Sequence, residues 1–168
     1  MANRKNVSSM SAQDLAKLRQ LLDNYISSSN DPVAEHKKAG KKMSMMIHST
    51  GFLAWHQYFV AKLEHWLVTN NNANFVPLPY WDPADPIPSQ LNKNNNNVNK
   101  PLPANLRQPT LAQVASYTAL TNLILPYHTD VHNNAGGNMP NTEKSPSDPI
   151  FWPFHSFLIS VYEQWRNL

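Results

Sequence analysis

Two aromatic-rich stretches of this chain repeat one another, and each is centred on a histidine. The first reads Phe-Leu-Ala-Trp-His and ends at His56, and the second reads Phe-Trp-Pro-Phe-His and ends at His155. A Phe four residues before each histidine, a Glu eight residues after it and a Trp ten residues after it recur in both copies. Two similar helices that present two equivalent histidines suggest a pseudo-symmetric core. A pair of metal ions is the best candidate for what such a core would hold.

Apolar residues recur at steps of three and four along the first half, which predicts amphipathic helices. Ser11 is a favourable helix cap and is followed three residues later by a carboxylate. Asn-Asp-Pro at 30–32 predicts a turn and a second helix start. The strongest helix signal runs from Gly51 to about Thr69 and places His56 inside the apolar stripe.

The second half predicts further helices separated by loops. Residues 82–110 are rich in proline and asparagine and are expected to form a long surface loop. A helix is expected from about Leu111, with a kink or restart at Pro126. A last helix is expected from about Pro153 to the C-terminus. The chain is therefore predicted to be mainly α-helical with long irregular loops.

Length and composition limit the classes of protein. A chain of 168 residues fits one domain over 1–168, with residues 1–10 expected to be flexible. The net charge of +3 is small, which gives no reason to expect nucleic acid as a partner. No stretch approaches the length of a membrane span, and the N-terminus lacks the apolar core of a signal peptide. By default, we expect a cytoplasmic protein.

The histidines are the most informative metal ligands, because the chain contains no cysteine. His128 and His132 are four residues apart, so both imidazoles should project from one helix face and can bind one ion together. His155 would come from a separate apolar helix. A second triplet is available in the first half: His36, His48 and His56.

Each histidine also has a simpler explanation. A single histidine in an aromatic stripe, such as His56, is more often a core residue bonded to a backbone carbonyl. His36 stands beside a run of lysines and could be solvated. Spacing alone would group His48 and His56 with His65, although His65 is expected to be a surface residue or a support for a ligand. The repeat and the number of compatible histidines favour the metal interpretation.

Three histidines per ion form a nitrogen-rich set of donors. Imidazole suits copper and zinc, whereas calcium and magnesium prefer oxygen. Carboxylate-bridged di-iron bundles use Glu-x-x-His pairs, and this sequence contains none. The residues alone leave copper and zinc open, and a metal-free helical interaction domain is the alternative.

Five short motifs follow one another in a fixed order. The first half contains Phe-Leu-Ala-Trp-His-Gln at 52–57 and Leu-Pro-Tyr-Trp-Asp at 78–82. The second half contains His-x-x-x-His at 128–132, Gly-Gly-x-Met at 136–139 and Ser-Pro-Ser-Asp-Pro-x-Phe-Trp at 145–152. This ordered set resembles the tyrosinase and catechol oxidase family of type-3 copper proteins, to which the oxygen-carrying hemocyanins are related.

The resemblance implies an antiparallel four-helix-bundle core that holds a dinuclear copper site. Its two copper ions would be bound by two triplets of histidines: His36, His48 and His56 for the first ion, and His128, His132 and His155 for the second. Substrate contacts would come from residues that adjoin the second triplet: Thr129, Asn133 and Met139. The buried site would be ringed by aromatic side chains that exclude water: Phe52, Trp55, Phe151 and Phe154.

The activity implied by the resemblance is the oxidation of o-diphenols to o-quinones by O2. Family members that hydroxylate monophenols often have Asn where Thr129 stands here, so o-diphenols or o-aminophenols are the expected substrates and monophenols are left open. Phe154 and Ile159 replace a histidine and an aspartate of the family pattern. A non-catalytic, hemocyanin-like protein that binds O2 or copper is the alternative. A phenolic small molecule and O2 are the expected partners. Neither nucleic acid nor a membrane is expected as a partner, and a homo-oligomer is left open.

Overall fold

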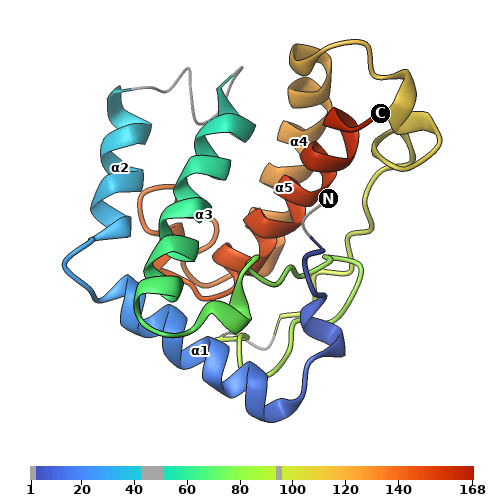
Figure 1. The fold of residues 1–168 in the computed structure, drawn as a ribbon. Coiled ribbons are helices and arrows are strands. Elements are labelled where there is room, and N and C mark those ends of the chain that lie inside the picture. The colour runs from blue at the N-terminus through green and yellow to red at the C-terminus, as the bar shows by residue number, and fades with distance from the viewer. Residues whose placement is uncertain (1–2, 43–50, 94–95) are drawn as a thin grey trace.

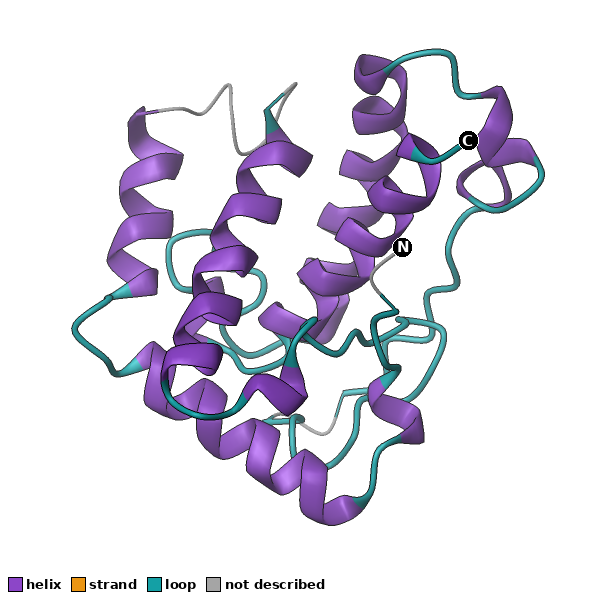
Figure 2. Ribbon diagram, viewed as in Figure 1, coloured by secondary structure: helices purple, strands orange, loops and turns teal. Residues whose placement is uncertain are grey.

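The structure, a computed structural model, describes residues 3–42, 51–93 and 96–168. Within these ranges the chain is mainly α-helical, and its only β-type pairing is an isolated bridge between Asn6 and Tyr80 (Figure 2). The α-helices are α1 (Ala12–Ile26), α2 (Pro32–Lys42), α3 (Phe52–Thr69), α4 (Tyr117–Ala135) and α5 (Phe151–Arg166). Short 3-10 helices are η1 (Val7–Ser9), η2 (Ala73–Phe75), η3 (Ala104–Leu106), η4 (Thr110–Gln113) and η5 (Ser145–Ser147). The predicted mainly α class is confirmed.

Four helices surround the middle of the molecule. In Figure 1, α2, α3, α4 and α5 stand side by side, and α1 lies across one end of α2 and α3. The two repeat copies, α3 and α5, pack directly against each other: the ring centroids of Phe59 and Trp152 are 5.0 Å apart. Buried apolar side chains from α1, α3, α4 and α5 form one contiguous cluster. Among the helices that the structure describes, none has the length and hydropathy needed to cross a bilayer.

Two helix starts follow the predicted capping chemistry. The Ser11 hydroxyl accepts a hydrogen bond from the backbone N–H of Asp14 at 3.0 Å. The Asp31 carboxylate accepts one from the N–H of Ala34 at 3.1 Å, and Pro32 is the first residue of α2. These caps satisfy backbone donors that have no partner inside the helix.

The helix expected from about Leu111 begins later, at Tyr117. Residues 110–113 form η4 instead, and the Ser116 hydroxyl caps α4 by accepting from the N–H of Ala119 at 3.2 Å. Of the expected kink or restart at Pro126, the restart is wrong, because α4 continues through Pro126 to Ala135. Pro126 and Asn122, the residue whose carbonyl loses its helical donor, are both exposed, so water can replace the missing bond.

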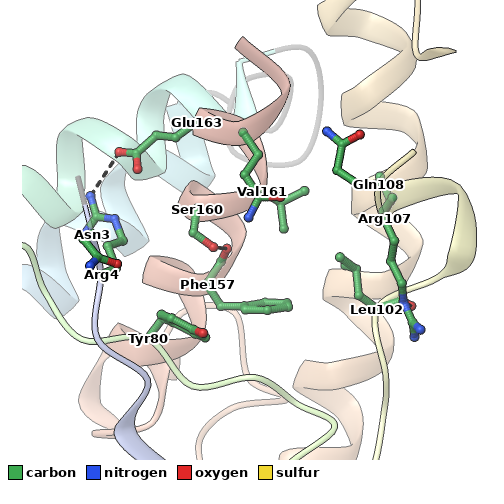
Figure 3. Close-up of a pocket in the computed structure, with 12 residues that line it drawn as sticks. Asn3, Arg4, Tyr80, Leu102, Arg107, Gln108, Phe157, Ser160, Val161 and Glu163 are labelled. Atoms are coloured by element: carbon green, nitrogen blue, oxygen red, sulfur yellow. Dashed lines mark hydrogen bonds and ion pairs between the residues drawn. The ribbon is translucent and has the colours of Figure 1, made fainter. Parts of the chain in front are cut away.

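Flexibility is predicted for residues 1–10, and the described part of this segment, residues 3–10, makes specific contacts with α3, α5 and segment 78–82. The Arg4 guanidinium pairs with both glutamates of the repeat, with Glu64 at 2.6 Å and with Glu163 at 3.2 Å. Figure 3 shows the contact with Glu163. Val7 is fully buried, and its N–H donates to the Tyr80 carbonyl at 2.8 Å. A cation between two carboxylates and a buried apolar anchor hold this segment against α3 and α5.

The segment expected as a surface loop at 82–110 contains no α-helix, and its described residues include only the short helix η3 and the first residue of η4. It is not confined to the surface, however, since four of its apolar side chains are buried: Ile87, Leu91, Val98 and Leu106. The loop therefore contributes to the core that it crosses.

Candidate metal centre

Three histidines of the second half meet in the interior. His128 and His132 come from α4 and His155 comes from α5, and one ring nitrogen from each lies within 4.8 Å of the others. The Nε2 atoms of His128 and His155 are 3.3 Å apart. All three side chains are buried. Three imidazole nitrogens at this separation could hold one metal ion, and such a donor set suits copper or zinc.

Two histidines of the first half extend this cluster. The His56 ring, from α3, stacks on the His155 ring with centroids 4.5 Å apart and planes 17° apart. The His36 ring, from α2, lies 5.8 Å from the His56 ring. Both are buried. Four helices thus bring five buried histidines together, while His48, the remaining member of the first predicted triplet, lies outside the described residues.

The repeat orients its two histidines in the same way. His56 Nδ1 lies 2.9 Å from the Phe52 carbonyl, and His155 Nδ1 lies 2.8 Å from the Phe151 carbonyl. Each carbonyl is one helical turn before its histidine, and it fixes the tautomer because only a protonated Nδ1 can donate to it. In that tautomer Nε2 carries the lone pair that a metal requires. The carbonyl bond expected for a core histidine therefore also prepares these rings as ligands.

A loop carbonyl orients a third ring. His132 Nδ1 lies 2.7 Å from the carbonyl of Met139. The chain reaches this position because α4 ends at Ala135, the capping residue Gly136 has φ of 71°, and Gly137 follows with φ of 57°. Residues with a β-carbon disfavour positive φ, so the two glycines allow the chain to turn back toward α4. The Gly-Gly-x-Met motif is thus linked to the orientation of His132.

Aromatic rings enclose the imidazoles, as expected. The Phe151 ring stacks on His155 at 3.9 Å, and the Phe52 ring contacts His128 at 4.7 Å. Phe154, which replaces a histidine of the family pattern, lies parallel to His128, with planes 8° apart. These three phenylalanines are fully buried, whereas Trp55 is half-buried. Their apolar surfaces pack against the imidazole rings of the cluster.

Burial sets the protonation of His155. Loss of solvation lowers the pKa of His155 well below its usual value of 6.5, and the neighbouring His56, His128 and His132 lower it further. A neutral imidazole is the form that binds a metal. The environment of His155 therefore fits the role of a ligand.

A small pocket of about 60 Å³ adjoins the cluster. All three predicted substrate contacts line it: Thr129, Asn133 and Met139. His36, His128 and His132 form part of the same wall. Thr129 and Asn133 are exposed and one helical turn apart on α4, whereas Met139 is buried. Sequence reasoning did not identify three further lining residues, Pro140, Thr142 and Ser145. Their place in the chain was the available signal: Pro140 and Thr142 follow the Gly-Gly-x-Met motif, and Ser145 is the first residue of η5.

Other features lie apart from this pocket. His65 is exposed and lines a separate surface pocket with Tyr58 and Trp66. A further pocket, of about 390 Å³, lies between α5 and the segment before η4, and Figure 3 shows Phe157 and Leu102 on its two sides. Among the described residues, no histidine lines this pocket of about 390 Å³.

Segment 78–82 connects the two repeat helices. The Glu64 carboxylate of α3 accepts a hydrogen bond from the N–H of Leu78 at 2.8 Å. The hydroxyl of Ser156, in α5, donates to the Leu78 carbonyl at 2.6 Å. Trp81 is fully buried, and its backbone N–H donates to the Pro153 carbonyl at 3.0 Å. The Leu-Pro-Tyr-Trp-Asp motif thus braces the helices that carry His56 and His155.

Comparison with known proteins agrees with these motifs. The common central domain of tyrosinase matches residues 11–119 and 87–168. The tyrosinase-like protein tyr-3 of Caenorhabditis elegans is 26% identical over an alignment of 166 positions, and the match covers 69% of this chain and 24% of that protein. The chain thus spans about a quarter of the length of this curated relative. No solved structure matches the chain significantly. The family match extends over most of the sequence, and the chain belongs to the tyrosinase family.

Proposed function

We propose that this chain is a copper-dependent oxidase that uses O2 to convert o-diphenols, or the related o-aminophenols, to o-quinones or o-quinone imines. The observation that carries the proposal is the group of five buried histidines, from four helices, beside a pocket with exposed residues at its mouth. Membership of the tyrosinase family supports copper as the metal. Two copper ions per chain, one for each predicted triplet, are part of the proposal.

The reaction balances with O2 as the oxidant. Each o-diphenol loses two electrons and two protons as its two C–O bonds become carbonyls, and two such molecules reduce one O2 to two waters. Bound copper would supply the one-electron steps between the phenol and O2.

The residues of this chain would hold the ligands and keep the site dry. The Phe52 and Phe151 carbonyls fix the His56 and His155 rings, and burial keeps His155 neutral. The surrounding phenylalanine rings exclude bulk water, which strengthens electrostatic interactions inside the site. The protein would thereby present preoriented donors that need no rearrangement during turnover.

The mouth of the pocket favours diphenols over monophenols. Thr129 and Asn133 are the exposed residues beside the second triplet, and neither side chain can act as a base near neutral pH. A monophenol would need to lose its proton before hydroxylation, and neither of these two residues can accept that proton. An o-diphenol or o-aminophenol is oxidised more readily and requires less assistance.

Oxygen consumption tests the proposal. Copper-loaded protein should consume O2 with catechol and with o-aminophenol, and more slowly or not at all with a monophenol. Protein treated with a copper chelator is the control and should be inactive. If the copper-loaded protein consumes O2 with none of the three compounds, the proposed oxidase is contradicted.

A non-catalytic carrier of O2 or copper is the second candidate. The observation that favours it is the size of the pocket, about 60 Å³, because a cavity of about 150 Å³ is needed to hold a benzene ring. Reversible oxygenation of the copper-loaded protein without net O2 consumption would identify a carrier.

A further inference from the structure

The pocket beside the histidines has an uncharged wall. Apart from its three histidines, the described lining consists of Thr129, Asn133, Met139, Pro140, Thr142 and Ser145. In the part of the chain that the structure describes, no Asp, Glu, Lys or Arg lines this pocket. The described wall therefore offers hydroxyl, amide and apolar groups but no counter-charge.

Three described charged residues that adjoin the lining residues in sequence are already paired. Lys37 and Glu143, which each follow a lining residue, form an ion pair of 2.8 Å. Asp130, which follows the lining residue Thr129, pairs with Lys100 at 2.9 Å. Lys144 is exposed and is not part of the described lining. A charged substituent that entered this mouth would lose hydration without gaining a partner of opposite charge.

The pocket is small. Its volume of about 60 Å³ is less than half of the roughly 150 Å³ that holds one benzene ring. One edge of a single ring can enter while the rest of the molecule stays at the mouth, where Thr129 and Thr142 are exposed. A substituent opposite the entering edge would therefore meet the uncharged rim.

Ser145 provides a buried polar group in the same wall. Its side chain is fully buried, and its Oγ has no hydrogen-bond partner within the described residues. A buried hydroxyl without a partner is destabilising, because it has lost its hydrogen bonds to water without replacing them. Because Ser145 lines the pocket, a polar group of a bound ring is a suitable partner.

We infer that this site accepts small, single-ring phenols or aminophenols whose substituents are uncharged, and that the Ser145 hydroxyl hydrogen-bonds a polar group of the bound ring. The inference rests on the proposed oxidase function and narrows its substrate class. It excludes carboxylated and amine-bearing catechols as preferred substrates.

Isosteric substrate pairs test the selection against charge. We compare kcat/KM of copper-loaded protein for 3,4-dihydroxybenzamide and 3,4-dihydroxybenzoate, and for 3,4-dihydroxybenzyl alcohol and 3,4-dihydroxybenzylamine. The members of each pair share the diol, so the charge of the metal ions acts on the same reacting end. The uncharged member should be preferred by about tenfold or more in each pair. Equal values, or a preference for a charged member, would overturn the inference.

A charge placed at the mouth should change this preference. Thr142→Lys should raise the kcat/KM of the benzoate relative to the benzamide by about tenfold, because the new ammonium supplies the missing partner. Thr142→Gln has a polar side chain without the charge and should leave the ratio unchanged. The same change in both variants would show that charge does not decide the selection.

Ser145→Ala tests the hydroxyl. It should lower kcat/KM for catechol by about fivefold, the value of one neutral hydrogen bond, mainly through KM. Ser147→Ala is the matched control in the same 3-10 helix, because the Ser147 hydroxyl already donates to the Lys144 carbonyl at 2.7 Å. Equal effects of the two substitutions would contradict the assigned role of Ser145.

Binding without turnover separates this inference from the proposed function. Reduced, copper-loaded protein kept under argon cannot oxidise catechols, and calorimetry then measures the affinity for each isosteric pair directly. Absence of O2 consumption together with preferential binding of the uncharged members would contradict the oxidase and support the selectivity. O2 consumption without any preference would support the oxidase and contradict the selectivity.

Discussion

The imidazole rings of His56 and His155 stack across the contact between α3 and α5, with centroids 4.5 Å apart. They occupy the same position in the two copies of the sequence repeat, and each donates to the carbonyl of the Phe four residues earlier. The pseudo-symmetry seen in the sequence is therefore present in the backbone bonds that orient the two rings. It places one proposed ligand of each copper at the centre of the bundle.

Replacement of either central histidine should remove copper from the protein. His56→Ala and His155→Ala should each lower the copper content per chain and abolish catechol oxidation, because each removes one nitrogen donor from a triplet. His65→Ala is the control, since His65 is exposed and lines a different pocket. Copper analysis and O2 uptake check both effects. Similar losses in all three variants would contradict the assigned ligands.

Loss of Arg4 should destabilise the fold. Only 6% of the Arg4 side chain is exposed, and it separates the carboxylates of Glu64 and Glu163. Arg4→Met leaves both carboxylates without their cation and should lower the free energy of unfolding by about 2–4 kcal/mol. Urea unfolding measures the change.

The exposed neighbour Lys5 provides the control for that measurement, and Lys5→Met should change stability by no more than about 0.5 kcal/mol. Adding Glu64→Gln and Glu163→Gln to Arg4→Met should recover part of the loss, because no uncompensated charge remains. Equal stability of Arg4→Met and the natural protein would show that the ion pairs contribute nothing.

Acid should weaken the metal-free protein through His155. Its pKa is lowered in the folded state, chiefly by burial, whereas the unfolded chain keeps a value of about 6.5. The unfolded state therefore binds more protons below that pH, and the free energy of unfolding falls by as much as about 1.4 kcal/mol per pH unit. Unfolding curves between pH 8 and pH 5 measure the slope. His155→Gln should reduce it, and an unchanged slope in that variant would contradict the assignment.

The two glycine substitutions Gly136→Ala and Gly40→Ala should act in opposite directions. Gly136 has φ of 71° and ψ of −163°, a region that costs residues with a β-carbon about 1–3 kcal/mol. Gly136→Ala should lower thermal stability and also weaken copper binding, because the following turn brings the Met139 carbonyl to His132. Gly40 lies within helix α2, where alanine should stabilise by about 0.5–1 kcal/mol. Destabilisation by both substitutions would argue against this explanation.

Features that depend on local spacing could be predicted from the sequence. The helix containing His56 begins at Phe52, as its apolar periodicity indicates, and the cap at Ser11 forms as expected. The approach of His128 to His132 follows from their i,i+4 spacing, with ring centroids 4.3 Å apart. That these histidines bind copper remains a prediction.

Features that depend on distant contacts could not be predicted in this way. Arg4 is one of two adjacent basic residues near the N-terminus, and its partners lie 60 and 159 positions away. Ser145 belongs to a recognisable motif, but nothing in that motif indicates that its hydroxyl lies beside the histidines. The late start of α4 depends on the cap at Ser116, which competes with the apolar spacing that favoured Leu111.

Copper titration with O2 uptake tests the central proposal most directly. Copper is added stepwise to metal-free protein, and the rate of catechol oxidation is recorded at each ratio of copper to chain. The rate should rise with added copper and reach a plateau at two copper ions per chain. A protein that binds no copper, or that binds two ions and consumes no O2 with catechol, would contradict the central proposal.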